Sequence, residues 1–216
     1  MHKGYASSSL LDTYQAERLP VIAEMLDLTT DLLKKTIKSG GELKRGDEFR
    51  QMGVNCRSSP IVYEDETEGR SNGHWPAYSR ESESAARAGD RAPDSPVSQH
   101  SAGEEKDTNL FSIFSPTQHT ALIFPGLEDQ LASIASVIRN LPKGAVQSAA
   151  ILKPGAHPPP NHLVDMALVD KMGHAHSGYH VVYGVPCIIV VRPDGVVGAR
   201  VRSAEGFEEY FKRLLA

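Results

Sequence analysis

Five consecutive apolar residues, Cys187 to Val191, place the strongest constraint on how this chain can fold. The run is too short for a helix, and β-branched residues dominate it, so it predicts a strand that is buried on both faces. A turn is predicted at Arg192-Pro193-Asp194-Gly195, because proline presets φ and glycine accepts a positive φ. Val196 to Val201 then predicts the return strand of a hairpin.

A helix is predicted after this hairpin, from Ser203 to Leu215. Four large apolar side chains recur at helical spacing along one face of that segment: Phe207, Tyr210, Phe211 and Leu214. Charged residues occupy the opposite face, which is typical of a helix that packs against a sheet.

Regular elements are also predicted between Leu110 and Met172. In chain order they are strands at Leu110–Phe114 and Thr120–Phe124, a helix at Glu128–Asn140, a strand at Val146–Leu152 and a helix at Asn161–Met172. With the terminal hairpin and helix, this is the element order of the thioredoxin fold, and the alternation predicts a mixed sheet with helices on both faces.

The first ordered element predicted is a long helix from Ser9 to Lys38. Ser9 can cap its first turn, and the apolar residues at helical spacing are Leu11, Tyr14, Val21, Met25, Leu28 and Leu32. Pro20 predicts a kink, or two helices that meet at a first-turn proline.

The segment from Glu64 to Asp107 is rich in Ser, Glu, Arg, Gly and Asp and carries few aliphatic residues. Such a composition buries too little apolar surface to offset the entropy of ordering, so it predicts a disordered linker. The expected fold class is α/β: a thioredoxin-like mixed sheet with flanking helices, preceded by a long N-terminal helix and this linker. The expected division is 1–63, 64–107 and 108–216.

Charge and cysteine content point to an intracellular protein. The formal net charge of −4 gives no reason to expect a nucleic-acid partner. No apolar run approaches the length of a membrane span, and no signal-peptide core stands near the N-terminus, so the expected location is the cytoplasm. The two cysteines, Cys56 and Cys187, lie far apart and are expected to be reduced thiols.

A thiol mechanism requires a low-pKa cysteine where the first helix of a thioredoxin-like domain begins. This chain has Pro125-Gly126-Leu127-Glu128 there, so dithiol oxidoreductase chemistry is rejected. Val185-Pro186 stands where thioredoxins place a cis-proline, and Pro186 is a candidate for that conformation. Cys187 opens a buried strand and is expected to be an inert core thiol.

Other candidate sites are weaker. His174 and His176 offer two metal ligands if Asp170 joins them, but no spacing fixes them on one rigid face. The loop GVNCRSSPIVY, which contains Asn55, Cys56 and Arg57, forms either a polar site or a turn that satisfies its own backbone. No dinucleotide-binding, Walker A or nucleophile-elbow motif is present. We therefore assign no catalytic, cofactor-binding or metal-binding residue from the sequence.

Four segments together resemble the phenol-hydroxylase group of FAD-dependent aromatic monooxygenases. LLDTYQAERLPVIAEML, Leu10 to Leu26, is similar to the helix that follows the flavin domain in that family. GVNCRSSPIV resembles its next loop, where a tyrosine often stands at the position of Cys56. GDRAPDSPV and VRPDGVVGARV resemble the entry to the family's C-terminal domain and the terminal hairpin of that domain.

The resemblance implies a fold and cofactors. Such enzymes carry an FAD domain, a substrate domain and a thioredoxin-like C-terminal domain that contributes to dimerisation, and they hydroxylate phenolic rings with NAD(P)H and oxygen. Their flavin-binding motifs lie upstream of the region matched here, so no flavin-binding or catalytic residue carries over. Residues 1–63 would be a remnant of the flavin and substrate region. The isolated chain is expected to bind neither FAD nor NAD(P)H.

Three hypotheses follow from the sequence. The first is a truncated or C-terminal portion of a flavin-dependent monooxygenase that hydroxylates phenolic compounds in secondary metabolism, joined by a flavin-domain protein. The second is a non-catalytic thioredoxin-like scaffold that forms a homodimer. The third is a flavin-independent enzyme that uses His119, or the pair His174 and His176, as general base.

Overall fold

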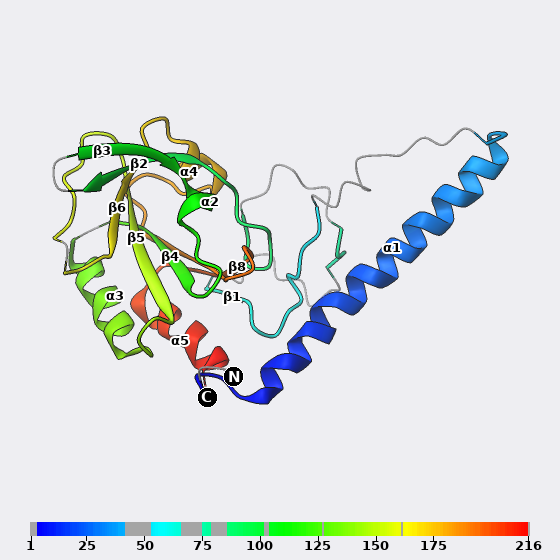
Figure 1. The fold of residues 1–216 in the computed structure, drawn as a ribbon, viewed down its shortest axis with the longest axis horizontal. Coiled ribbons are helices and arrows are strands. Elements are labelled where there is room, and N and C mark those ends of the chain that lie inside the picture. The colour runs from blue at the N-terminus through cyan, green and yellow to red at the C-terminus, as the bar shows by residue number, and fades with distance from the viewer. Residues whose placement is uncertain are drawn as a thin grey trace.

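A computed structural model of the protein describes residues 4–41, 53–65, 75–78, 86–101, 104–126, 128–160 and 162–215. It shows a rounded α/β body from which one long helix, α1 (Asp12–Lys38), extends outward (Figure 1). None of the helices that the structure describes combines the length and the apolarity that crossing a membrane requires.

Four strands form the centre of the sheet, in the spatial order β8-β7-β4-β5. They are β4 (His119–Phe124), β5 (Val146–Leu152), β7 (Cys187–Val191) and β8 (Val197–Val201). β4 and β5 run parallel, whereas β7 is antiparallel to both β4 and β8. The helix α3 (Glu128–Asn140) connects the parallel pair, as a parallel connection requires. This order and these directions are the topology of the thioredoxin fold that the sequence predicts.

Further strands extend this centre to an eight-stranded sheet in the described residues. On one side β6 (Met166–Val169) runs parallel to β5, and the hairpin of β2 (Pro96–Ser101) and β3 (Glu104–Asn109) follows antiparallel to β6. On the other side β1 (Tyr63–Glu64) runs parallel to β8. The predicted mixed sheet is therefore confirmed, and it is larger than predicted.

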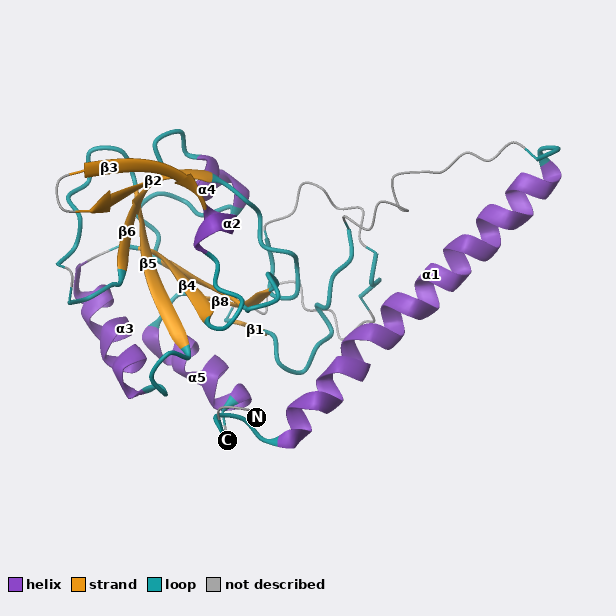
Figure 2. Ribbon diagram, viewed as in Figure 1, coloured by secondary structure: helices purple, strands orange, loops and turns teal. Residues whose placement is uncertain are grey.

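All five residues of Cys187–Val191 are apolar because both faces of the sheet are covered at this strand. Ile188 and Val190 contribute to one core cluster, under α3 and α5 (Ala204–Leu214), whereas Ile189 and Val191 contribute to another on the opposite face. Figure 2 shows α3 and α5 together on one side of the strands. Alternate side chains of one strand thus reach two separate cores.

The terminal hairpin and helix are confirmed. The turn closes with a hydrogen bond from the Gly195 amide to the Arg192 carbonyl (2.9 Å), and Gly195 adopts a φ of 80°. Ser203 caps α5, because its Oγ accepts a hydrogen bond from the Gly206 amide (3.2 Å). The predicted inward face of this helix, Phe207, Tyr210, Phe211 and Leu214, is buried.

Two element assignments made from the sequence are wrong. The helix predicted over Asn161–Met172 does not form in the described residues, and Met166–Val169 instead forms β6, between β5 and β2. The pairing of this short apolar run with two neighbouring strands outweighs its weak helical spacing. The strand predicted over Leu110–Phe114 is the helix α2 (Leu110–Ile113), because the Asn109 side chain accepts a hydrogen bond from the Ser112 amide (3.0 Å) and caps it.

The segment predicted as a linker contributes to the sheet. β2 lies within residues 64–107 and β3 begins there, so the sheet starts before the predicted boundary at residue 108. This hairpin needs few aliphatic side chains because the ladders of β2 with β3 and with β6 satisfy its backbone. For residues 66–74, 79–85 and 102–103 the prediction of disorder lies outside the described part of the chain.

The N-terminal helix departs from its predicted start and from its predicted break. A short 3-10 turn, Ser8–Leu11, leads into α1, and neither Ser7 nor Ser9 caps it through its side chain. α1 continues through Pro20 as one helix rather than two (Figure 1). Pro20 removes the amide donor to the Ala16 carbonyl, and Ala16 is exposed, so water can take that place. Pro186, the candidate cis-proline, follows a trans peptide bond.

Candidate functional site

A histidine and a carboxylate form a buried pair at the end of β6. Asp170 follows this strand, and His176 lies in the short helix α4 (His174–Gly178). The Nδ1 atom of His176 lies 2.8 Å from Oδ2 of Asp170, and the backbone amide of His176 donates to the same oxygen (2.9 Å). Gly173 permits this return of the chain, since it adopts a φ of 73° between the strand and the helix.

Packing holds the imidazole of His176 in one orientation. Asp170 is fully buried and His176 is 6% exposed. The ring of Tyr183 stacks on His176 with 4.2 Å between centroids, and Phe124 meets it edge-on at 5.0 Å. A carboxylate accepts hydrogen bonds, so this contact favours the tautomer of His176 with its proton on Nδ1, which leaves Nε2 as an acceptor. Some buried polar atoms of the described residues lack a hydrogen-bond partner, and Nε2 of His176 is not one of them.

His176 lines a cleft of about 380 Å³ between the end of β5, the start of α3 and the loops after β5 and before β7. Leu131, Ile151, Leu163 and Tyr183 also line it, together with the prolines at 158, 159 and 160. The walls are largely apolar, and His176 is the buried polar side chain among them. The arrangement can bind a small apolar molecule and exchange one hydrogen bond with it.

A second polar cluster joins α1 to the β7–β8 hairpin. Arg192 donates from Nη1 and Nη2 to the two carboxylate oxygens of Glu17 (2.7 and 3.1 Å), and Ser59 Oγ donates to Oε1 of Glu17 (2.6 Å). Arg192 and Glu17 are 12% and 15% exposed, so the pair is mostly sheltered from water. Burial opposes the charge on Arg192, but the hydrogen bond to Glu17 and the charge of Asp194 raise its pKa. This cluster fixes the first half of α1 against the sheet.

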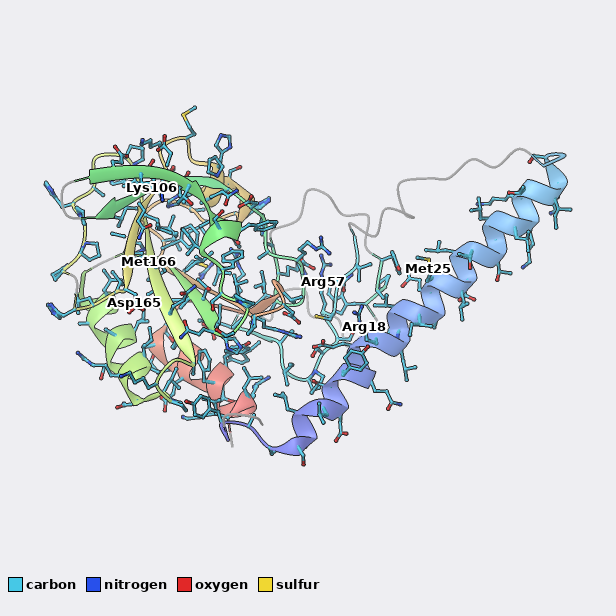
Figure 3. All side chains as sticks on the ribbon, in the orientation of Figure 1. Arg18, Met25, Arg57, Lys106, Asp165 and Met166 are labelled. Carbon is cyan, nitrogen blue, oxygen red and sulfur yellow. The ribbon has the colours of Figure 1, made fainter. Side chains whose placement is uncertain are left out.

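The side chains of the loop GVNCRSSPIVY mainly contact a distant segment, which neither of its two readings predicted. Arg57 forms a bidentate pair with Asp90 (2.7 and 3.0 Å), and Figure 3 shows Arg57 between the α/β body and α1. Asn55 donates to the carbonyls of Pro76 and Ala77 (2.9 and 3.2 Å). The loop thus satisfies the backbone of a distant segment as well as its own.

The other candidate residues do not form sites. His174 is exposed, and the described residues contain no group of three His, Cys, Asp or Glu side chains that could hold a metal, so Asp170, His174 and His176 are not a metal centre. His119 packs edge-on against Tyr210 and Phe211, and burial lowers its pKa to about 4. Cys187 is buried in the core, as predicted.

From the sequence, Asp170 and His176, with His174, are conditional metal ligands, and the hydrogen-bonded pair that Asp170 and His176 form is missed. The only signal in the sequence is an aspartate at a strand end followed by glycine and a short helix. The stacking residue Tyr183 was missed entirely, because it lies in a loop that only the fold brings to His176.

Pro125 and Gly126, the described residues between β4 and α3, do not fit the pyrophosphate of FAD. A phosphate cradle needs free backbone amides where the helix begins, yet Pro125 has none. A Cβ added to Gly126 would lie 2.9 Å from Cδ of Pro186, so this glycine makes room for Pro186 rather than for a ligand. We derive no step of flavin chemistry from this chain.

Comparison with known proteins supports the resemblance seen in the sequence. No family model matches the chain. A flavin-dependent monooxygenase from Mycobacteroides abscessus is 24% identical over 210 residues, which are 97% of this chain and 32% of that protein. The structure of the flavin-dependent monooxygenase PieE in complex with FAD and substrate matches 98% of this chain and 40% of its own, with 18% identity and a TM-score of 0.63.

The chain therefore spans about a third of the curated relative that it matches. A thioredoxin domain of a thiol-disulfide oxidoreductase from Bacteroides vulgatus is also similar over 60% of this chain and 98% of its own, with 10% identity and a TM-score of 0.47. The resemblance to flavin-dependent monooxygenases is confirmed across nearly the whole chain.

Proposed function

We propose that this chain is the helix and thioredoxin-like portion of a cytoplasmic flavin-dependent monooxygenase that hydroxylates phenolic or aromatic compounds in secondary metabolism. The observation that carries the proposal is the single alignment over 97% of this chain, which covers only 32% of a flavin-dependent monooxygenase. In such an assembly FAD, reduced by NAD(P)H, supplies the oxygen chemistry. On this proposal the phosphate cradle for FAD belongs to the portion that this chain does not match.

The exposed apolar side chains of α1 support the proposal that another protein portion packs against this helix. No residue of α1 is buried, although the helix carries many large apolar side chains. Those more than half exposed are Tyr14, Leu19, Ile22, Leu26, Leu33 and Ile37. Ile22, Leu26 and Leu33 fall on one stripe of the helix at spacings of four and seven residues. A single polypeptide seldom leaves such a stripe in water without a partner.

We assign that partner as the FAD-binding portion, because two thirds of the relative's length lie outside the region that this chain matches. The hydrogen bonds of Glu17 to Arg192 and Ser59 hold the first half of α1 on the thioredoxin-like body. The rest of the helix projects away from that body (Figure 1). On this proposal α1 bridges the two portions, and the body itself takes no part in electron transfer.

The mass of the native polypeptide tests this directly, through an antibody to residues 203–216. A band at about three times the 23.5 kDa of this chain is the expected result if both portions share one polypeptide. With a band at 23.5 kDa, the chain should bind a separately expressed flavin portion and restore NAD(P)H oxidation with a phenol. Failure of both, with a stable homodimer instead, would favour the non-catalytic scaffold.

A further inference from the structure

We propose that the cleft at His176 binds a small, ring-bearing apolar molecule through one hydroxyl group, which donates a hydrogen bond to Nε2 of His176. The lining residues that the structure describes belong to this chain alone. The cleft, the buried pair behind it and the aromatic ring beside it together define this ligand class.

The size and lining of the cleft set the class of ligand. A volume of about 380 Å³ falls in the range of sites that hold small organic molecules. Most of the walls come from aliphatic side chains, prolines and the ring of Tyr183, whereas the polar groups of Lys153 and His157 belong to side chains exposed to solvent. An apolar ring system therefore gains more from this cleft than a sugar or a phosphate ester does.

The buried pair sets the polar contact. Oδ2 of Asp170 accepts from Nδ1 of His176, so neutral imidazole presents Nε2 as an acceptor. A ligand hydroxyl can donate to it. A ligand carboxylate is disfavoured, because it would approach the fully buried Asp170 carboxylate through one imidazole ring. Oδ1 of Asp170 lacks a partner in the described residues, so no second donor draws the carboxylate away from His176.

A role in stabilising the fold accounts for only part of the contacts that His176 makes. The hydrogen bond from the His176 amide to Asp170 joins α4 to the end of β6, and any residue except proline at position 176 provides that amide. The imidazole, its orientation by Asp170 and its stacking with Tyr183 at 4.2 Å are additional. Outer partners that fix the tautomer of a histidine are typical of sites where the other nitrogen meets a ligand.

The test uses this 216-residue chain and two probes of matched shape, 2-naphthol and 2-methoxynaphthalene. Both fit an apolar cleft, but only 2-naphthol donates a hydrogen bond. Binding is followed by NMR of the histidine ring nitrogens and of the backbone amides. We expect 2-naphthol to bind about tenfold more tightly than its methyl ether and to shift the Nε2 resonance of His176, which the ether leaves in place.

Variants separate the hydrogen bond from the cleft. His176→Phe keeps an aromatic ring but should abolish the preference for 2-naphthol, whereas His174→Phe, an exposed site on the same helix, should leave it unchanged. If His176→Phe does not fold, Ala156→Phe decides, because it fills the cleft and leaves the pair intact. Equal affinity for the two probes, an unmoved Nε2 resonance or undiminished binding to Ala156→Phe would overturn the proposal. None of these results depends on a flavin portion, so the proposed function is tested separately.

Discussion

Tyr210 shows how one buried residue can limit its neighbours. Its hydroxyl has no hydrogen-bond partner in the described residues, and burial raises its pKa. Gly198, on β8, lies directly beneath it: an added Cβ would overlap the hydroxyl oxygen and lie 2.7 Å from Cζ. Glycine at this position is thus required by the close approach of a side chain, and not by its backbone angles.

We expect Gly198→Ala to lower the free energy of unfolding by about 1–3 kcal/mol, because the extra methyl overpacks the core. Tyr210→Phe should leave it unchanged or raise it by up to about 1 kcal/mol, since it removes an unpaired buried hydroxyl. The double variant should recover part of the loss. Urea denaturation measures all three, and additive effects would contradict the contact.

His119 makes stability depend on pH. Burial lowers its pKa from 6.5 to about 4, so the folded protein keeps this imidazole neutral where the unfolded chain binds a proton. The stabilisation is complete above pH 6.5 and declines as the pH falls toward 4, because protonation then favours the unfolded state. We expect the free energy of unfolding to fall by about 3 kcal/mol more across that pH window than it does for His119→Phe, which keeps the ring contacts. Parallel pH profiles for the two proteins would refute this.

Cys56 is expected to be an unreactive thiol. Burial, followed by the negative charge of Glu17, raises its pKa to about 12, and Sγ lies 3.4 Å from the Gly89 carbonyl oxygen. The thiolate is therefore scarce at neutral pH. Iodoacetamide should label Cys56 in the native protein at least about 100-fold more slowly than in urea. Rapid labelling of the native protein would show that the loop opens.

At the scale of elements, the attachment of α1 depends on Glu17. The two hydrogen bonds to Arg192 and the one from Ser59 converge on a single carboxylate. Farther along the helix, Glu24 accepts from the amides of Ala77 and Tyr78 (2.7 and 3.2 Å). Since α1 has no buried residue, these polar contacts rather than an apolar core fix its position.

Glu17→Gln should therefore weaken the attachment of α1 by about 1–3 kcal/mol, because it leaves a sheltered Arg192 with a poorer partner. The measurement is hydrogen exchange, which should accelerate in the first half of α1 and at the hairpin. Asp31→Asn serves as the control, because it removes an exposed ion pair with Lys34 (3.6 Å). It should change the free energy of local opening, as measured by hydrogen exchange, by less than about 0.5 kcal/mol. Similar effects of the two variants would mean that Glu17 has no special role.

At the scale of the whole molecule, the apolar stripe of α1 and the cores of the body serve different purposes. The body has its own cores on both faces of the sheet. We expect Ile22→Glu combined with Leu26→Glu to leave the stability of the body within about 0.5 kcal/mol, since both side chains are more than half exposed.

The same double variant should abolish binding to the flavin portion, measured by sedimentation of the mixture. Lys34→Glu makes the same change of two charge units at an exposed position about 100° around the helix from Leu33, and it should leave binding intact. Loss of binding in both variants would indicate that charge, and not the stripe, controls the association.

The sequence alone determined those elements whose own pattern of apolar and capping residues predicts a helix or a strand. The extents of β5, β7 and α3 follow residue by residue from apolar runs and amphipathic spacing, and those of β4 and α5 follow to within one residue at each end. Ser203 identifies the start of α5 as its cap. Such signals are local, because helices and strands each have a characteristic spacing of apolar residues and helix starts favour particular capping residues.

Only the tertiary structure decided the features that depend on distant partners. β6 is a strand because β5 and β2 flank it, and β2 and β3 are ordered through backbone ladders that composition does not reveal. The site at His176 arises likewise: Asp170, His176 and Tyr183 come from a strand end, a short helix and a loop. Hydrogen bonds and ring contacts between such segments have no period in the sequence, and they exist only once the sheet has brought the segments together.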